Sequence, residues 1–235
     1  MSARAAVDNE VISYLDMCQR EGANLQKRMN YNIGRDHSVI LMSLRRDAPY
    51  RDKIEDEGTI LIYEGHDAPK NAAHHNPKAV DQPERTPAGS LTENGKFHKA
   101  AQNYKASRDA PERVRVYEKL HRGIWSYNGV FHLVDSWTEP DGHRNVFKFK
   151  LIAVAEDENF SSPPRKDIQR RRVIPTAVKL EVWQRDSGKC QICGATNELH
   201  FDHVLPYSKG GTSIRVENVQ LLCARHNLEK RDKII

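Results

Sequence analysis

The sequence has no apolar run of about 18 residues, which is the length that a membrane-spanning helix requires. Its first residues, Met1 to Arg4, lead into a charged pattern and lack the apolar core of a secretory signal. We therefore expect a cytoplasmic protein with no membrane partner. Cysteine is also scarce, with four among 235 residues, and three of the four lie near the carboxy terminus. This grouping favours metal binding over disulfides.

The composition is that of a globular protein, with 29% charged and 38% hydrophobic residues. The length suits two domains of ordinary size or one large domain. The net charge of +5 and the isoelectric point near 9.0 favour a polyanionic partner such as nucleic acid. Many basic proteins bind no nucleic acid, so the charge alone does not identify the partner.

Hydrophobic periodicity predicts an α+β protein. Residues 9–28 repeat apolar side chains at helical spacing, and we expect one amphipathic helix that is broken near Gly22. Short alternating or β-branched runs follow and predict strands at 38–42, 59–63, 114–117, 130–134 and 146–151. Several strands with few helices predict a mixed sheet or β-barrel.

Residues 68–95 are rich in Pro, Asn, His and Gly, and they predict a long functional loop. The histidines of this loop lack regular ligand spacing. We therefore favour contact with DNA over a second metal site.

Residues 156–175 are polar, contain two consecutive prolines and include a run of three arginines. This composition is typical of a linker between domains. It divides the chain into a first domain at 1–155 and a second at 176–235. The arginines either contact phosphate or are simply solvated.

Two pairs of potential metal ligands lie about thirty residues apart near the carboxy terminus. Cys190 and Cys193 form the first pair, Cys223 and His226 the second, and two residues separate the members of each pair. This spacing predicts a tetrahedral zinc site, with the first pair on a tight turn closed by Gly194 and the second on one face of a helix. Such a closed site serves folding rather than chemistry. Thiols that only pack in a core would not require paired spacing.

Polar residues recur in a fixed order between and after these ligand pairs. They are the pair Asp202-His203, the turn Gly210-Gly211, Asn218 and, after the second ligand pair, Asn227. Residues 178–233 closely resemble the HNH family of ββα-metal nucleases, because all these features occur in the family's order within a zinc frame. The resemblance implies a small zinc-containing ββα domain that cuts phosphodiester bonds with one divalent metal ion.

By this resemblance, His203 is the general base, since a neutral imidazole titrates near working pH. Asp202 and Asn227 hold the catalytic metal, and their oxygen ligands suit Mg²⁺ or Mn²⁺. Asn218 fixes the loop and orients His203 through its amide.

Other interpretations of these residues stay open. His203 could be a structural histidine, and we expect His200 to be one. Asn218 could merely cap the final helix, which is compatible with the family role. Many relatives carry a cysteine at the position of His226; a Cys-Cys-Cys-His site still binds zinc. The difference leaves open whether His226 or Asn227 serves the catalytic metal, and we favour Asn227.

The preceding part of the chain carries a second ordered set of motifs. They are Ser38 to Leu41, Ala48 to Asp52, Gly58 to Gly65, Asp81-Gln82, Val114 to Val116, Trp125 to Phe131, Ser136-Trp137 and Phe147 to Leu151. In this order they resemble SRA (YDG) domains. The resemblance implies a barrel or mixed sheet with flanking helices that reads modified cytosine by flipping it out of the duplex.

In SRA domains, aromatic rings sandwich the flipped base and polar groups test its Watson–Crick edge. By this resemblance, Tyr63 is one stacking wall, Tyr50 is the second, and Asp52 accepts a hydrogen bond from the cytosine amino group. Tyr50 and Asp52 require a one-residue shift relative to the family's spacing, and Tyr63 could instead pack in the core. Residues 127–129 read Tyr-Asn-Gly where the family has Tyr-Asp-Gly, and we expect a small effect of this change.

An SRA-like reader joined to an HNH nuclease is the arrangement of modification-dependent restriction endonucleases. We predict an enzyme that recognises double-stranded DNA containing 5-methylcytosine or 5-hydroxymethylcytosine and cleaves it nearby. It would use structural Zn²⁺ and catalytic Mg²⁺ or Mn²⁺. One HNH site cuts one strand, so a double-strand break implies two protomers or two binding events, and we expect a homodimer. Two rivals stay open: an HNH nuclease for another modification or for unmodified DNA, and a reader of modified DNA that does not cleave.

Overall fold

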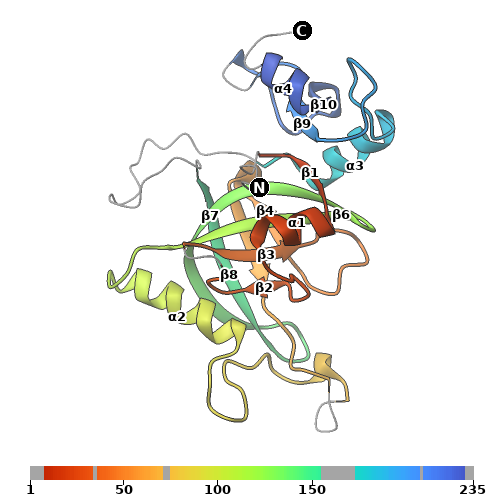
Figure 1. The fold of residues 1–235 in the computed structure, drawn as a ribbon. Helices are drawn as coiled ribbons and strands as arrows, with labels where there is room; N and C mark the ends of the chain where they lie inside the picture. Colours follow the sequence, from red (N-terminus) through yellow and green to blue (C-terminus); the bar gives the residue numbers. More distant parts are fainter. Residues whose placement is uncertain (1–7, 34–35, 71–74, 155–172, 207–208, 231–235) are drawn as a thin grey trace.

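The computed structural model describes residues 8–33, 36–70, 75–154, 173–206 and 209–230. Within these ranges the chain forms an eight-stranded sheet and a separate two-stranded sheet. The smaller sheet and the carboxy-terminal helices lie at one end of the larger sheet (Figure 1). The predicted α+β class, with a sheet-rich first part and a small second part, is confirmed. No helix in the described ranges is long and apolar enough to cross a bilayer.

The larger sheet is mixed and strongly curved (Figure 1). Its strands are β1 (Val11–Ser13), β2 (Met29–Asn30), β3 (Ser38–Met42), β4 (Lys53–Glu55), β5 (Ile60–Glu64), β6 (Glu112–His121), β7 (Ile124–Pro140) and β8 (Asn145–Val154). The main path runs in the order β2-β3-β6-β7-β8-β5-β4, and β1 pairs with β7. Neighbouring strands are antiparallel, except that β3 and β6 are parallel. The five predicted strands are confirmed as β3, β5, β6, β7 and β8, with β6 and β7 much longer than predicted.

The helix predicted over residues 9–28 is wrong in extent. Residues 11–13 form β1 against residues 124–126 of β7, and α1 spans only Tyr14–Glu21. Ser13 caps α1 by accepting a hydrogen bond from the Asp16 amide, and Gly22 ends it with φ of 61°. The predicted break near Gly22 is therefore confirmed. A strand forms before it because β-branched residues gain cross-strand partners on β7.

A second helix, α2 (Glu93–Lys105), follows the predicted loop and was not predicted from the sequence. It lies against β7 and buries Phe97 and Ala101 in the main core, whose other members come mostly from the strands of the larger sheet. Of the predicted loop at 68–95, residues 71–74 lie outside the described residues. The remainder contains the short 3-10 turn η2 (Pro77–Ala79).

The carboxy-terminal part is built around an antiparallel hairpin. Its elements are α3 (Thr176–Arg185), β9 (Leu199–His203), the 3-10 turn η4 (Val216–Asn218), β10 (Val219–Cys223) and α4 (Ala224–Lys230). Apolar side chains from α3, β9 and β10 form a second core, to which Leu120 of β6 also belongs. The small part therefore packs directly on the larger sheet.

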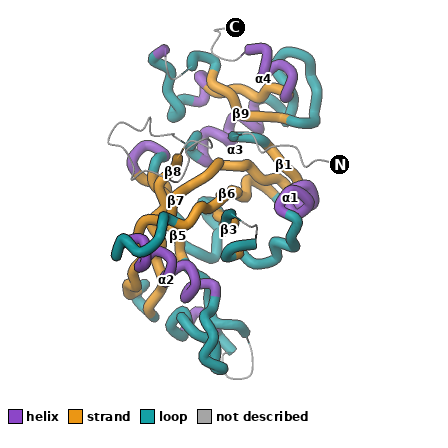
Figure 2. Tube along the Cα trace, turned by 60° about the vertical axis from the view of Figure 1, so that its left-hand side comes forward, coloured by secondary structure: helices purple, strands orange, loops and turns teal. Residues whose placement is uncertain are grey.

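The two parts meet where β1 passes close to β9 (Figure 2), and backbone hydrogen bonds join them there. The Asn9 N–H donates to the Tyr127 carbonyl of β7 at 2.8 Å, and the Asn9 carbonyl accepts from the Phe201 N–H of β9 at 3.0 Å. Val173 packs in the main core, whereas the next residue, Ile174, packs in the second core. Residues 155–172, which hold most of the predicted linker and its arginines, lie outside the described residues.

Candidate functional sites

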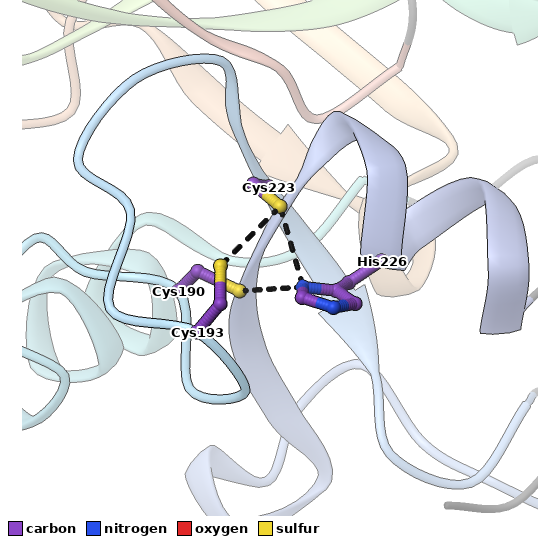
Figure 3. A group of neighbouring side chains, drawn as sticks. All are labelled: Cys190, Cys193, Cys223 and His226. Atoms are coloured by element: carbon purple, nitrogen blue, oxygen red, sulfur yellow. Dashed lines mark hydrogen bonds between the residues drawn. The ribbon is translucent and has the colours of Figure 1, made fainter.

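Four side chains of the carboxy-terminal part converge (Figure 3). Cys190 and Cys193 follow α3, Cys223 ends β10, and His226 lies in α4. The Sγ atoms of Cys190 and Cys223 each lie 3.4 Å from His226 Nδ1, and Cys193 Sγ lies 3.8 Å from Cys223 Sγ. All four ligand atoms lie within 4.8 Å of one another. Gly194 closes the first turn as predicted, with φ of 75° and its N–H on the Cys190 carbonyl.

This donor set fits a tetrahedral zinc ion. Zinc–ligand bonds of about 2.0 to 2.3 Å place tetrahedral ligands roughly 3.5 to 3.8 Å apart, close to the observed separations. Burial opposes ionisation of the Cys190 thiol, but the N–H groups of Cys223, Cys193 and Ile192 outweigh it and lower the pKa of Cys190 to about 6. The thiolate is the form that binds metal. Four protein ligands leave no open coordination position, so an ion here stabilises the fold.

Asp202 and His203 end β9 on the side of the hairpin that contacts α4. His203 Nε2 lies 2.9 Å from Ser213 Oγ, a partner that the sequence did not suggest. Burial lowers the pKa of His203; nearby Lys230 adds to this effect and Asp202 opposes it. The ring is therefore held neutral, which is the form that a general base requires. His200, expected to be structural, is 1% exposed.

Lys230 is a site residue that sequence reasoning missed. Its Nζ lies 2.8 Å from Asp202 Oδ2 and donates to the His203 carbonyl, while its side chain is 1% exposed. Asn227 lies one helical turn before Lys230, so the two occupy neighbouring positions on α4. That spacing from Asn227 was the available signal.

The carboxylate of Asp202 fits a cation site. Its Oδ2 is buried and receives no hydrogen bond of good geometry, although Lys230 lies within ion-pair distance. Lys230 and Asp202 therefore form an ion pair, because charge attraction depends less on angle than a hydrogen bond does. Asp202 thus lies where positive charge is favoured.

Asn218 ties together the chain that follows β9. Its Oδ1 accepts from the Leu205 N–H at 2.7 Å, and its Nδ2 donates to the carbonyls of Leu205 and Thr212 at 3.1 and 2.9 Å. Gly211 is required beneath this amide, because a Cβ there would lie 1.8 Å from the Leu205 carbonyl oxygen. The predicted role in fixing the loop agrees with these bonds. The amide bonds Leu205, two residues after His203, and Thr212, which precedes the Ser213 partner of His203, so it supports His203 through the main chain on both sides.

In the larger sheet, Tyr50 and Tyr63 face a common space. The Cζ atom of Arg28 lies over both rings, 4.0 Å from the centroid of Tyr50 and 4.5 Å from that of Tyr63. Tyr63 belongs to β5 and is fully buried, whereas Tyr50 precedes β4 and is half-buried. We call the space that these two rings face the tyrosine slot. Tyr63 also belongs to the main core, so the alternative that it packs in the core holds as well.

Asp52 lines the tyrosine slot with a buried carboxylate. It accepts hydrogen bonds from Arg28 Nη2 and, at 3.1 Å each, from the N–H groups of Ser43 and Glu64. Burial raises the pKa of Asp52, while Arg28 and these N–H groups oppose the rise. The structure therefore brings together all three predicted pocket residues. It adds Arg28, for which the sequence offered no signal because it precedes Tyr50 by a long stretch of chain.

Lys78, from the predicted DNA-contacting loop, contacts Tyr50, one wall of the tyrosine slot. Its Nζ lies 4.0 Å from the Tyr50 centroid and 3.0 Å from Asp67 Oδ2, and it donates to the Pro49 carbonyl at 2.6 Å. The loop thus contributes a basic side chain beside the slot.

Residues 190–233 match the family model described as HNH endonuclease. The chain therefore carries the domain of a metal-dependent nuclease, and this prediction is confirmed. A search of curated proteins found no match.

Solved structures similar to this chain include SRA domains, which the sequence also resembles. The SUVH5 SRA domain with hemi-methylated CG DNA is 19% identical, with a TM-score of 0.43, over 68% of this chain and 95% of that one. The same domain bound to fully hydroxymethylated CG DNA is 20% identical, with a TM-score of 0.44, over 68% and 95%. The Type IV phosphorothioation-dependent restriction endonuclease ScoMcrA is 15% identical, with a TM-score of 0.44, over 97% of this chain and 60% of that one.

Proposed function

We propose that this protein is a modification-dependent DNA endonuclease. Its larger sheet would read a modified cytosine, and its HNH domain would hydrolyse a phosphodiester bond near that base. The observation that carries the nuclease half is that Asp202 and His203 lie together against α4, beside the Cys-Cys-Cys-His cluster.

In the proposed reaction, His203 takes a proton from the water that attacks phosphorus, and the bond to the leaving oxygen breaks. Ser213 holds the imidazole through Nε2, and the loop fixed by Asn218 keeps Ser213 in place. Asp202 and Asn227 would hold the divalent ion, which when bound stabilises the charge that develops on the phosphate and the leaving oxygen. Lys230 positions the end of β9 through Asp202 and the His203 carbonyl.

The reader half is supported by the chemistry of the tyrosine slot. Two aromatic faces supply stacking surfaces for a flat base, and stacking contributes about 1 to 3 kcal/mol per base. Asp52 supplies an acceptor for the exocyclic amino group of cytosine. Its two backbone N–H partners hold this carboxylate at the slot. The slot therefore offers the contacts that a flipped cytosine requires.

Cleavage of matched duplexes tests both halves. The duplexes differ only in one base, which is cytosine, 5-methylcytosine or 5-hydroxymethylcytosine, and a fourth carries a phosphorothioate linkage. Each is incubated with Mg²⁺ or Mn²⁺ and with wild-type protein, His203→Ala, Tyr50→Ala and His143→Ala. His143 is the matched control, because it is an exposed histidine in the β7–β8 turn.

We expect cutting of the modified-cytosine duplexes only, its loss in His203→Ala, and its retention in His143→Ala. Tyr50→Ala should lose the preference for modified DNA. Equal cutting of all duplexes would retain the nuclease and exclude the modified-cytosine reader. Cutting of the phosphorothioate duplex alone would assign another modification, and binding without cutting would favour the non-cleaving reader.

A homodimer follows from the chemistry of a double-strand break. One HNH site hydrolyses one strand per binding event, so cleavage of both strands takes either two copies or two binding events, and we propose two copies. Sedimentation of the protein with and without modified DNA measures this directly. A monomer that only nicks DNA would contradict the proposed assembly and leave the proposed activity intact.

A further inference from the structure

Arg28 makes the contacts that the proposed function assigns to a base. Its guanidinium Cζ atom lies over both rings, 4.0 and 4.5 Å from their centroids, within the tyrosine slot. Its Nη2 donates to Asp52, the carboxylate proposed for the cytosine amino group. A planar group with an N–H donor therefore already fills the space that a flipped cytosine would need.

We propose that the Arg28 side chain occupies the tyrosine slot of the free protein in place of a base. It must leave the slot before a flipped base binds. This inference rests on the proposed function of the slot as a base pocket. Arg28 is then a specificity-determining residue, because a base enters only when its own contacts outweigh those that Arg28 gives up.

The Arg28 side chain has a path out of the slot. Its side chain is 20% exposed, whereas that of Asp52 is fully buried. The Arg28 carbonyl accepts from the Leu41 N–H at 2.7 Å, which anchors the main chain. Rotation of the side chain thus carries the guanidinium to the surface beside exposed Lys27 while the backbone stays in place.

Asp52 stays ready for the base after Arg28 has left. The N–H groups of Ser43 and Glu64 remain 3.1 Å from the carboxylate and keep it oriented. The amino group of an incoming base then donates to Asp52 in place of Arg28. The guanidinium and the base use the same ring faces and the same acceptor, so their occupancies exclude each other.

The first test compares Arg28→Ala with Lys27→Ala, which removes an equal charge from the neighbouring exposed position. Fluorescence anisotropy measures binding to duplexes with one cytosine or one 5-methylcytosine, and 2-aminopurine beside that base reports flipping. If Arg28 occupies the slot about nine-tenths of the time, the apparent affinity for a flipped base is about tenfold weaker than that of an open slot. Arg28→Ala should therefore bind modified DNA about tenfold more tightly and should flip unmodified cytosine too. Lys27→Ala should weaken both duplexes alike.

A second test needs no DNA. Millimolar 5-methyl-2′-deoxycytidine should raise the melting temperature of Arg28→Ala but not that of the wild type, because only the variant has a free slot. If Arg28→Ala does not fold, Arg28→Lys replaces it in both tests, since it keeps the charge at Asp52 but has no planar group.

The outcomes separate this inference from the proposed function. Wild-type preference for modified DNA, with Arg28→Ala weakening both duplexes alike, would overturn only the role of Arg28. Stabilisation of Arg28→Ala by methylguanidinium but not by the nucleoside would overturn the base pocket and the inference with it. Stabilisation by the nucleoside, with tighter binding of modified DNA, would support both.

Discussion

Lys179 of α3 forms a buried ion pair that joins the nuclease domain to the larger sheet, and Lys179→Ala should strongly destabilise the protein. Its Nζ lies 2.8 Å from Glu118 Oε2 and 2.6 Å from Asn128 Oδ1. The side chains of Lys179 and Glu118 are 0% and 1% exposed. Among the described residues, removing Lys179 leaves the Glu118 carboxylate with the neutral donors Thr176 and Asn128.

The expected loss follows from this burial. At 2.8 Å the attraction is about 6 kcal/mol for an effective dielectric constant of about 20, and desolvation of both groups offsets part of it. Breaking such a pair by removing one partner costs roughly 3 to 5 kcal/mol. For a chain of this size, that loss corresponds to a fall in melting temperature of about 6 to 20 °C.

Thermal unfolding followed by circular dichroism measures the effect. Lys99→Ala is the control, because it removes the same charge from an exposed position on α2. The double variant Lys179→Met with Glu118→Gln should recover much of the loss, since it leaves no unpaired buried charge. A melting temperature for Lys179→Ala within about 2 °C of the wild type would refute the reasoning.

Three further predictions concern the ligand cluster, the loop beside it and acid stability. Chelation of zinc should unfold residues around Cys190 and His226, seen as faster amide exchange there and unchanged exchange in β6 to β8. Gly211→Ala should abolish nicking while bound zinc, measured by atomic absorption, stays equimolar, because the Cβ would strike the Leu205 carbonyl. Burial lowers the pKa of His66 to about 4, with Arg28 adding to the effect. The unfolded chain, with a histidine pKa near 6.5, thus binds the extra proton between these values, and stability should fall as pH drops from about 6.5 towards 4. Urea unfolding at pH 7 and pH 5 should show less acid sensitivity in His66→Gln, and an equal loss in both proteins would contradict this assignment.

Asn128, where SRA domains carry aspartate, illustrates a contact that the local sequence does not reveal. The small effect that we expect of this change stays a prediction, and Asn128 bridges the buried pair by donating to Glu118 at 3.0 Å and accepting from Lys179. An aspartate there would put a second carboxylate beside Glu118 with a single lysine to neutralise both. The amide is therefore explained by α3 packing on β6 and β7, a contact that no local pattern reveals.

The sequence by itself determined the features that depend on short-range spacing. The Cys-x-x-Cys and Cys-x-x-His pairs, the Asp-His pair and the alternating strands carry their signal within a few residues, because turn and strand geometry repeat locally. Only the tertiary structure decided the others. Residues 11–13 became a strand because β7 offered them an edge. Arg28 reached the tyrosine slot, and Lys179 reached Glu118, because sheet curvature and domain packing brought distant segments together, and burial then required a partner for each charge.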